Sequence, residues 1–263
     1  MDSVRTALRV FEFIAINRDI GVSELARRLD EPKSTVQRSL ATLHAAGWIR
    51  PVAGSGRRRS WEVSLRVFTL TRTFRPVMRL RRAALPHMRA LRDATGETIH
   101  LMAPDGPEVV LIERIDSTLS LRTVRRLGVR APLHVASNGK AVMAALPTTE
   151  VDAYLAGDLA AWTPHTIIDP QRIRADLIEV RRLGYATSIG EFDDGVNAVA
   201  AAILDPEGRP AGSLSISCPA VRLPRELIPE RGLMVAEAAR AIGRDLAAWA
   251  ERPIESDQAG FES

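Results

Sequence analysis

Apolar residues between positions 23 and 47 recur at helical spacing and predict two short helices joined by a tight turn. In the first helix Leu25 and Leu29 share one side, and Ser23 is suited to cap the helix start because its hydroxyl can accept a hydrogen bond from a free backbone N–H. Pro32 has no N–H with which to continue the helix. The chain must therefore turn before the second helix begins.

The second helix divides into an apolar face and a polar face. It restarts at Ser34, either as its N-cap or in its first turn, and Val36, Leu40 and Leu43 then fall on one side. The opposite side has no carboxylate and carries groups that can contact phosphates and base edges. The candidate DNA-contacting residues here are Lys33, Ser34, Thr35, Gln37, Arg38 and Thr42. This pattern is typical of a helix-turn-helix whose second helix enters the major groove.

A hairpin follows the second helix and favours the DNA-binding interpretation. Residues 47–50 begin one strand, residues 61–63 form the returning strand, and the Gly-rich tip between them carries Arg57, Arg58 and Arg59. We interpret this hairpin as a wing whose tip contacts the DNA backbone. Without it, the helix pair would fit an ordinary helical hairpin with a solvated polar face equally well.

Two further helices are expected around this module. Apolar positions within residues 4–14 predict a first helix that packs under the helix-turn-helix. Residues 65–82 predict another helix with an arginine-rich face, and an apolar stripe on it is a candidate contact surface between protomers. Pro86 favours a break near Leu85, and a new helix should run over residues 87–94.

Strand-like and helix-like stretches are mixed from residue 97 onward. Strands are predicted at residues 98–102, 109–113, 119–124, 185–188, 198–204 and 211–217. Helices are predicted at residues 138–146, 149–155, 170–183 and 227–249. A turn at residues 205–208 joins the last two strands. The pattern indicates an α+β fold with helices packed on an antiparallel sheet.

The charge is divided unevenly along the chain. Residues 1–92 carry 19 basic and 7 acidic side chains, net +12, whereas residues 93–263 carry 17 and 25, net −8. A basic N-terminal third on an acidic remainder fits a nucleic-acid-binding module joined to another module. No apolar run is long enough for a membrane helix, the N-terminus is unlike a signal peptide, and Cys218 is the single cysteine. We therefore expect a cytoplasmic protein with no membrane partner and no internal disulfide.

Six short motifs follow one another in order along the chain. They are Pro32–Arg38, Gly96–Leu101, Pro132–Ala141, Leu183–Ala186, Glu191 with Gly195–Ala201, and Leu214–Pro219. Together they make residues 3 to about 250 resemble the isocitrate-lyase-regulator (IclR) family of bacterial transcription factors. The resemblance implies dimers, often paired into tetramers, that bind palindromic double-stranded operators.

The resemblance also implies a domain organisation. It comprises a winged helix-turn-helix at residues 1–65, a linker helix at 66–82 and a GAF/PAS-like effector-binding domain at 83–252. Residues 253–263 form a polar tail that we expect to be disordered. The sequence leaves open whether the protein is a repressor or an activator, as well as its operator and its effector.

An effector site on the sheet is implied by the same resemblance. Its polar positions are Ser137, Asn138, Ser188, Ser215 and Ser217, with Thr123, Ala131, Val196 and Ala198 supplying apolar wall. Members that bind small carboxylates have an aspartate where this chain has Ser188 and a cysteine where it has Ala198. We therefore expect a less charged pocket and a mostly uncharged metabolite. Alternatively, Ser215 and Ser217 simply form the exposed face of a strand.

Two other functions are compatible with parts of the sequence, an enzyme and a DNA-binding regulator without a ligand. A phosphate-binding loop at residues 134–141 fails because His134 replaces its first glycine and Ala141 follows Lys140; we expect His134 and Lys140 to make structural contacts instead. No Gly-x-Ser-x-Gly motif occurs, and the histidines lack metal-ligand spacing. We therefore expect no catalysis, no cofactor and no metal. The remaining alternative is a DNA-binding regulator without a ligand, whose C-terminal domain only oligomerises.

Overall fold

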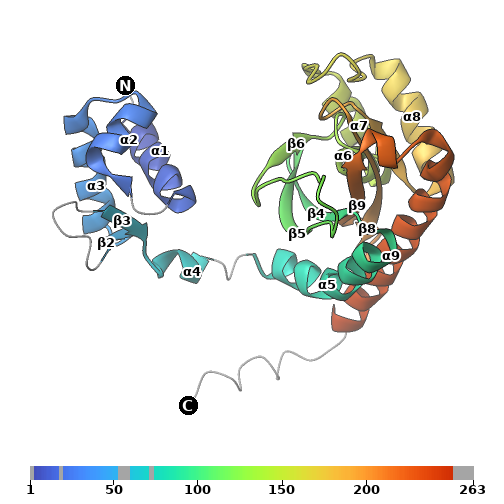
Figure 1. Ribbon diagram of the computed structural model, residues 1–263, viewed down its shortest axis with the longest axis horizontal. Helices are drawn as coiled ribbons and strands as arrows, with labels where there is room; N and C mark the ends of the chain where they lie inside the picture. The colour runs from blue at the N-terminus through green and yellow to red at the C-terminus, as the bar shows by residue number, and fades with distance from the viewer. Residues whose placement is uncertain (1–2, 18–19, 53–59, 71–73, 251–263) are drawn as a thin grey trace. The chain divides into compact units, whose positions relative to one another are not determined.

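The computed structural model of the chain describes residues 3–17, 20–52, 60–70 and 74–250 (Figure 1). The chain divides into two compact units, Met1–Arg75 and Pro76–Ser263. Two predicted features lie outside the described residues. They are the three arginines of the wing tip, Arg57, Arg58 and Arg59, and the polar tail at 253–263.

The N-terminal unit contains three helices and a small antiparallel sheet. In chain order its elements are α1 Ser3–Ile16, β1 Ile20–Gly21, α2 Val22–Leu29, α3 Lys33–Ala45, β2 Ile49–Pro51 and β3 Ser60–Val63. The strand order is β1-β3-β2, so β2 and β3 pair as the predicted hairpin. Val10, Leu25, Val36, Leu40 and Trp61 are buried together and join the helices to the hairpin. The predicted first helix and helix-turn-helix are confirmed.

The ends of α2 and α3 differ in detail from the prediction. Gly21 is the N-cap of α2, so Ser23 lies inside the first turn rather than capping it. The helix ends at Asp30, whose φ of 52° is in the left-handed region that aspartate tolerates better than most residues. Pro32 is the N-cap of α3, which places Ser34 in the first turn, one of its two predicted positions.

A long helix runs through the proline that was predicted to break it. Helix α4 spans Arg66–Leu70, and α5 spans Arg75–Thr95 with Pro86 inside it. Pro86 is exposed, whereas Ala84 and Met88 on the opposite side of α5 are fully buried. Water can therefore satisfy the backbone carbonyl that loses its partner, and the buried face keeps the helix continuous despite the proline.

The C-terminal unit is built on a six-stranded antiparallel sheet with the order β6-β5-β4-β9-β8-β7. The strands are β4 Thr98–Asp105, β5 Glu108–Ile115, β6 Arg130–Pro132, β7 Ala186–Ile189, β8 Val196–Leu204 and β9 Pro210–Pro219. A turn closed by Asp205 joins β8 to β9 as predicted, with the Gly208 N–H donating to the Asp205 carbonyl at 3.0 Å. The long strands β4 and β9 lie at the centre of the sheet.

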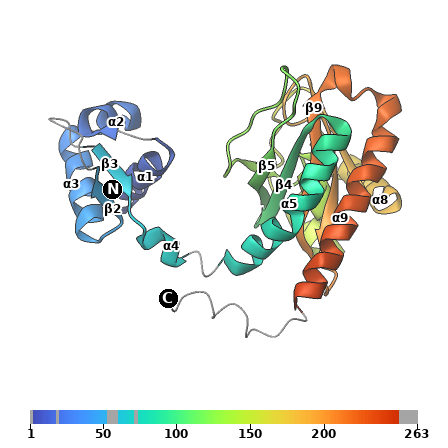
Figure 2. The same ribbon diagram turned by 60° about the horizontal axis from the view of Figure 1, so that its bottom comes forward.

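Helices cover both faces of this sheet (Figures 1 and 2). On one face α5 and α9, Ile228–Ala250, bury Leu101, Leu214 and Ile216. On the other, α6 Ser137–Ala145, α7 Thr148–Leu155 and α8 Pro170–Leu183 pack over a second apolar core. The predicted α+β class is therefore confirmed. In the part of the chain that the structure describes, no helix has the length and apolarity needed to cross a membrane.

One predicted strand is wrong. Residues 119–124 belong to a loop between β5 and β6, and the third strand of this region is the short β6. Leu121 and Val124 are 64% and 62% exposed, so the apolar run that suggested a strand is not buried against the sheet. This loop between β5 and β6 also carries Arg125.

Candidate functional site

The exposed face of α3 carries the residues predicted to contact DNA. Lys33, Ser34, Gln37, Arg38 and Thr42 are exposed, and Thr35 is half-buried. The Thr42 hydroxyl donates to the Arg38 carbonyl at 3.0 Å, which leaves the oxygen of Thr42 able to accept a further hydrogen bond. Among the described residues neither Lys33 nor Arg38 forms an ion pair, so both charges are available to phosphate groups.

Contacts around α3 hold this face in position. The Arg9 guanidinium of α1 donates to the Leu29 carbonyl at the end of α2, at 2.9 Å. His44 near the end of α3 donates from Nδ1 to the Ile49 carbonyl of β2 at 3.1 Å. The first contact ties α1 to α2, and the second ties α3 to the wing strands. These hydrogen bonds therefore help to fix the exposed face of α3 relative to the rest of the N-terminal unit.

A small pocket lies in the C-terminal unit, on the face of the sheet that α6 covers. Its lining comes from the first turn of α6, from β4, β5, β7, β8 and β9, and from the loops that carry Arg125 and Phe192. Seven of the nine predicted effector-site residues line it, namely Ser137, Asn138, Ser188, Val196, Ala198, Ser215 and Ser217. Seven further residues complete it: His100, Met102, Leu111, Arg125, Ala136, Phe192 and Asp193.

Two predicted residues do not line the pocket. Thr123 lies beyond its edge, where its hydroxyl is 3.4 Å from the Ser217 carbonyl and its own carbonyl accepts from Thr98. Ala131 is fully buried in β6, paired with Val109, and belongs to the apolar core beneath α6. Both were expected to supply apolar wall, and neither does so.

Strand alternation places the serines of β9 toward this pocket. Ser215 and Ser217 face the α6 side, whereas Leu214 and Ile216 face the core under α5 and α9. Ser215 is 1% exposed and Ser217 is 5% exposed. The alternative interpretation, in which these serines form a solvent-exposed strand face, is therefore wrong.

Some polar groups of the pocket are already hydrogen-bonded, and others are not. Asn138 Nδ2 donates to Ser213 Oγ at 3.1 Å, and Ser188 Oγ donates to the Val135 carbonyl at 3.2 Å. Ser215 Oγ and His100 Nε2 are buried and have no partner in the described structure. The first N–H groups of α6 are also free of helical hydrogen bonds, since that is a property of any helix start. The pocket can therefore offer hydrogen bonds to a ligand.

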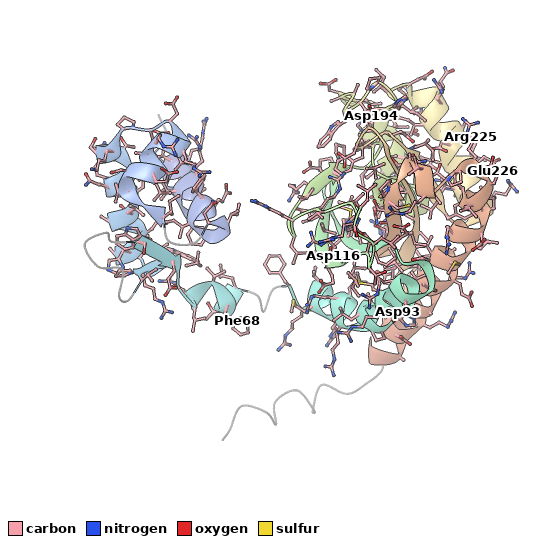
Figure 3. The ribbon with its side chains drawn as sticks, viewed as in Figure 1. Phe68, Asp93, Asp116, Asp194, Arg225 and Glu226 are labelled. Carbon is pink, nitrogen blue, oxygen red and sulfur yellow. The ribbon has the colours of Figure 1, made fainter. Side chains whose placement is uncertain are left out.

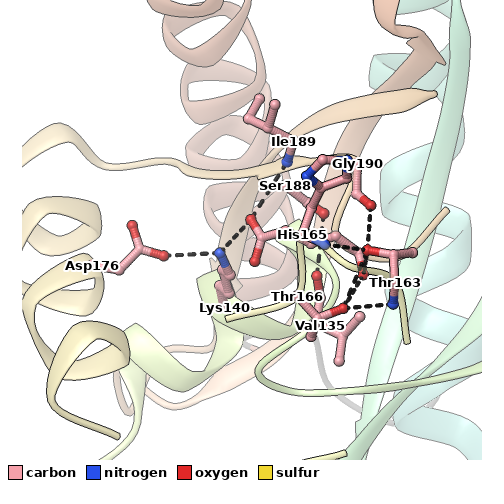
Figure 4. Close-up of polar contacts among 10 residues, drawn as sticks. Val135, Lys140, Thr163, His165, Thr166, Asp176, Ser188, Ile189 and Gly190 are labelled. Carbon is pink, nitrogen blue, oxygen red and sulfur yellow. Dashed lines mark hydrogen bonds and ion pairs between the residues drawn. The ribbon is translucent and has the colours of Figure 1, made fainter. Parts of the chain in front are cut away.

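A buried ion-pair network fixes the start of α6 beneath the pocket (Figure 4). Lys140 is 1% exposed, and its Nζ lies 2.8 Å from Glu191 Oε1 and 3.0 Å from Asp176 Oδ2. Burial raises the pKa of Glu191, and the charge of Lys140 opposes that rise. Lys140 thus has the structural role expected of it: it ties α6 to α8 and to the loop after β7.

Hydroxyl groups reinforce the same loop. Thr163 Oγ1 donates to the Gly190 carbonyl at 2.8 Å, and Thr166 Oγ1 donates to the Glu191 carbonyl at 2.7 Å (Figure 4). His134 makes structural contacts, as expected, with Nδ1 at 2.6 Å from the Tyr154 hydroxyl. These contacts hold the backbone from which Phe192 and Asp193 extend to the pocket.

Sequence reasoning missed the charged and aromatic side of the pocket. Arg125 lies in the loop that was assigned as a strand, and Phe192 and Asp193 lie in a connection that no periodic pattern marks. His100 lies in the motif Gly96–Leu101 but was given no role in the pocket. Its alternation with Ile99 and Leu101, both buried on the other face, was the signal that could have placed it in the pocket.

Two kinds of catalytic group, a metal cluster and a reactive cysteine thiol, are absent from the described residues. They contain no cluster of three or more His, Cys, Asp or Glu side chains that could hold a metal ion. Cys218 faces the core under α5 and α9, and burial raises the pKa of its thiol to about 12. That thiol is not a reactive nucleophile at neutral pH, because the thiolate is the reactive form.

Two family models match the chain. The one described as "Bacterial transcriptional regulator IclR C-terminal" matches residues 75–244, and the one described as "IclR helix-turn-helix domain" matches residues 3–53. Among similar proteins, the HTH-type transcriptional regulator KdgR of Escherichia coli is 34% identical, over 93% of this chain and 94% of its own. The acetate operon repressor of Salmonella typhimurium is 30% identical, over 92% and 89%.

Solved structures give the same result. A crystal structure of the Thermotoga maritima IclR superposes with a TM-score of 0.75 at 29% identity, covering 94% of this chain and 99% of its own. An IclR homologue from Microbacterium hydrocarbonoxydans, complexed with 4-hydroxybenzoate, superposes with a TM-score of 0.75 at 25% identity, covering 93% and 98%. The likeness spans both units of the chain and nearly the whole length of these structures.

Proposed function

This chain belongs to the IclR family of bacterial transcriptional regulators, and on that premise we propose that it binds a palindromic operator as a dimer and releases or tightens that contact when a small metabolite fills its pocket. Lys33, Ser34, Thr35, Gln37, Arg38 and Thr42 would read the major groove, and Arg57, Arg58 and Arg59 would contact the backbone beside it. The observation that carries the proposal is the exposed face of α3, which presents unpaired positive charge and no carboxylate.

A dimer is proposed because one winged helix makes few contacts with DNA, and two-fold symmetry doubles them on a palindrome. Apolar side chains around α4 supply a candidate surface. Leu65, Phe68 and Leu70 are 78%, 69% and 49% exposed, and Phe68 points away from its helix in Figure 3. Phe74, in the same unit of the chain, is 56% exposed. Water-exposed apolar groups at this density are typical of a surface that a second protein chain covers.

Control by a metabolite is supported by the pocket itself. It contains buried polar groups without partners, beside an apolar wall, and this combination is typical of small-molecule sites. The Microbacterium homologue was solved with 4-hydroxybenzoate, and a small organic molecule of that size is the kind of effector we propose here. The competing function is DNA binding without a ligand, and the unpartnered groups of the pocket argue against it because a purely oligomerising domain has no use for them.

Selection of DNA from a random double-stranded pool tests the operator proposal. The full-length protein should enrich an inverted repeat whose half-sites are centred about one or more helical turns of DNA apart, roughly 10 base pairs or a multiple of that spacing. Enrichment of a single, non-repeated half-site would contradict the dimeric reading. Calorimetry with a metabolite library on the same protein then separates a ligand-controlled regulator from one without a ligand.

A further inference from the structure

Two buried polar atoms in the pocket define one end of a ligand. His100 Nε2 and Ser215 Oγ lack partners in the described structure, and their residues are 4% and 1% exposed. They come from directly paired positions of β4 and β9, so they lie next to each other on the same face of the sheet. A buried group left without a hydrogen bond costs on the order of 1–3 kcal/mol. A ligand atom that bonds both groups therefore removes a cost that the empty pocket carries.

The imidazole at this end is a neutral group. Burial, together with the positive charges of Arg125 and Arg114, lowers the pKa of His100 to about 3. A neutral imidazole either donates or accepts through Nε2, and a serine hydroxyl does both. This end of the pocket therefore fits a hydroxyl or a carbonyl oxygen of a ligand, and it does not supply charge for an anion.

Positive charge is supplied to the pocket by Arg125, which also lines it and is near enough to His100 to help lower the pKa of that imidazole. Its guanidinium lies 3.9 Å from the centroid of the Phe192 ring and forms an ion pair with Asp193. The two partners are unequally placed, because the side chain of Arg125 is 18% exposed and that of Asp193 is 48% exposed. Burial lowers the pKa of Arg125, while the charge of Asp193 raises it. The cation thus belongs to the pocket, and its counter-ion stands at the rim.

The pocket is small and partly open to solvent. Its volume is about 40 Å³, room for only a few water molecules at roughly 10–15 Å³ each. Ser137, Asn138 and Ser188 are at most 4% exposed and are held by α6 and β7, so that side of the lining is fixed. Asp193 is half exposed and lies in a loop, which makes it the part of the lining that can move into water at least cost.

We propose that the pocket takes a small organic acid whose carboxylate replaces Asp193 on Arg125 and which also presents a hydroxyl or carbonyl oxygen to His100 and Ser215. The inference rests on the proposed function, in which this pocket is the effector site. Exchange of one carboxylate for another keeps the guanidinium compensated, whereas a neutral ligand that displaced Asp193 would leave a half-buried charge without its partner. The ring of Phe192 and the side chain of Val196 line the same pocket and would contact the apolar body of the ligand.

This inference departs from the expectation of an uncharged ligand. That expectation came from Ser188 and Ala198, which replace the aspartate and cysteine of carboxylate-binding relatives. The charge that selects the acid comes instead from a loop between β5 and β6, through Arg125. In this chain the acid is therefore recognised by a residue of that loop, and not by the strand positions that Ser188 and Ala198 occupy.

Calorimetric titrations of the full-length protein with matched acid and amide pairs test the charge requirement. The pairs are 4-hydroxybenzoate with 4-hydroxybenzamide, and lactate with lactamide, which differ in charge but hardly in shape. In at least one pair the acid should bind ten times more tightly than the amide. Arg125→Gln should weaken that acid at least tenfold and leave its amide unchanged. Arg126→Gln, an exposed neighbour in the same loop, should change neither.

A second pair of variants tests the exchange of carboxylates. Asp193→Asn removes the anion that competes for Arg125 and should strengthen binding of the acid several-fold. Asp194→Asn, at a neighbouring side chain that is 79% exposed, is the matched control and should have no effect (Figure 3). If the ion pair only held the loop in place, Asp193→Asn would weaken the acid instead, and that result would overturn the exchange.

The outcomes separate this inference from the proposed function. Amides that bind as well as acids, with affinities indifferent to Arg125→Gln, would overturn the acid assignment while leaving the pocket as an effector site. Failure of every acid and every amide to bind would count against both. An acid that binds through Arg125 supports both, and the Asp193 variant then decides how the site opens.

Discussion

At the scale of single residues, alternation along two paired strands decides what the pocket can bind. In β4 and β9 every second side chain faces the α6 side, so His100 and Ser215 meet there while their neighbours enter the opposite core. The same residue types in another register would be ordinary surface positions. A change at one of these positions should therefore alter the site without disturbing the core on the other face.

Arg38 is the residue at which DNA recognition is most easily tested. Arg38→Ala should weaken operator binding by about 1–3 kcal/mol if the guanidinium contacts a guanine, because a bidentate contact is worth that much discrimination. Mobility-shift titrations of the full-length protein measure the effect. Arg182→Ala on α8, an exposed arginine of the other unit, is the control. Equal operator affinity for both variants would remove Arg38 from the recognition face.

His100 should make stability depend on pH in a defined direction. Its pKa is about 3 in the folded protein and about 6.5 in the unfolded chain, so the unfolded state takes up a proton first as the pH falls. Stability due to this residue is therefore unaffected above pH 6.5 and falls by roughly 1.4 kcal/mol per pH unit below it. His100→Gln should reduce the loss of unfolding free energy between pH 7 and pH 5 by about 2 kcal/mol.

Urea titrations at the two pH values measure this difference. His165→Gln is the matched control, the same substitution at a side chain that is 59% exposed. A His100→Gln variant with an unchanged pH dependence would show that His100 is protonated at pH 5, and the neutral end of the pocket would have to be reassigned.

The sequence predicted single residues well where a repeating pattern or a family motif marked them. A period of 3.6 marked the outward face of α3, whereas Ser215 and Ser217 of β9 were named from the family resemblance, because a period of 2 alone allowed an exposed strand face as well. Arg125, Phe192 and Asp193 could not be found this way, because loop residues reach a site through the path of the backbone, which no local period encodes. The prediction that Ala131 lines the pocket has a related weakness, because a residue can match a family motif and still point into the core.

At the scale of elements, the first turn of α6 is held by close packing as well as by the Lys140 network. A Cβ at Gly139 would lie 2.6 Å from both Cα and the carbonyl oxygen of Leu133, closer than side chains approach a backbone. Glycine at this position therefore lets α6 start directly against the chain that leads from β6. The N–H groups of that turn and the side chains of Ser137 and Asn138 are placed by this contact.

Gly139→Ala should consequently move the start of α6 and weaken ligand binding. We expect a loss of about 1–3 kcal/mol of unfolding free energy, the usual cost of overpacking a tight site. Gly157→Ala is the control, since a Cβ there approaches only one carbonyl oxygen, at 3.3 Å. Urea denaturation compares the two variants. Equal stability of both would show that the contact with Leu133 relaxes easily and does not fix the helix.

Elements were predicted reliably where burial on one side was continuous, and less reliably where it was not. The helices at Pro170–Leu183 and Ile228–Ala250 agree with their predicted extents within a residue or two. The predicted break at Pro86 is wrong because it rested on the local effect of proline alone. The opposite face of α5 is buried against the sheet, and this tertiary packing keeps the helix continuous. The strand predicted at residues 119–124 is wrong because a run of apolar residues can also be solvent-exposed in a loop.

At the scale of the whole molecule, the proposed dimer predicts a specific response to changes around α4. Phe68→Asp should shift the protein toward a monomer of 28.8 kDa in sedimentation at micromolar concentration, because a buried carboxylate would oppose the contact. Val221→Asp, at an apolar residue that is 83% exposed on the C-terminal unit, serves as the control. An unchanged dimer in both variants would place the interface elsewhere.

Coupling between the pocket and DNA binding, as proposed above, must be reciprocal. A ligand that weakens operator binding tenfold must itself bind the DNA-bound protein tenfold more weakly, a difference of about 1.4 kcal/mol. The pocket and the DNA face lie in different units of the chain, so a change confined to the pocket should spare basal DNA affinity.

The most direct test is the operator affinity of the double variant Ser215→Ala, Ser217→Ala, measured by mobility shift with and without a compound that controls the wild type. The double variant should keep wild-type affinity for the operator and lose the response to the compound, because the hydroxyls that hold the ligand are gone and the face of α3 is untouched. A double variant that responds at the same compound concentration as the wild type would contradict it and place the effector outside this pocket.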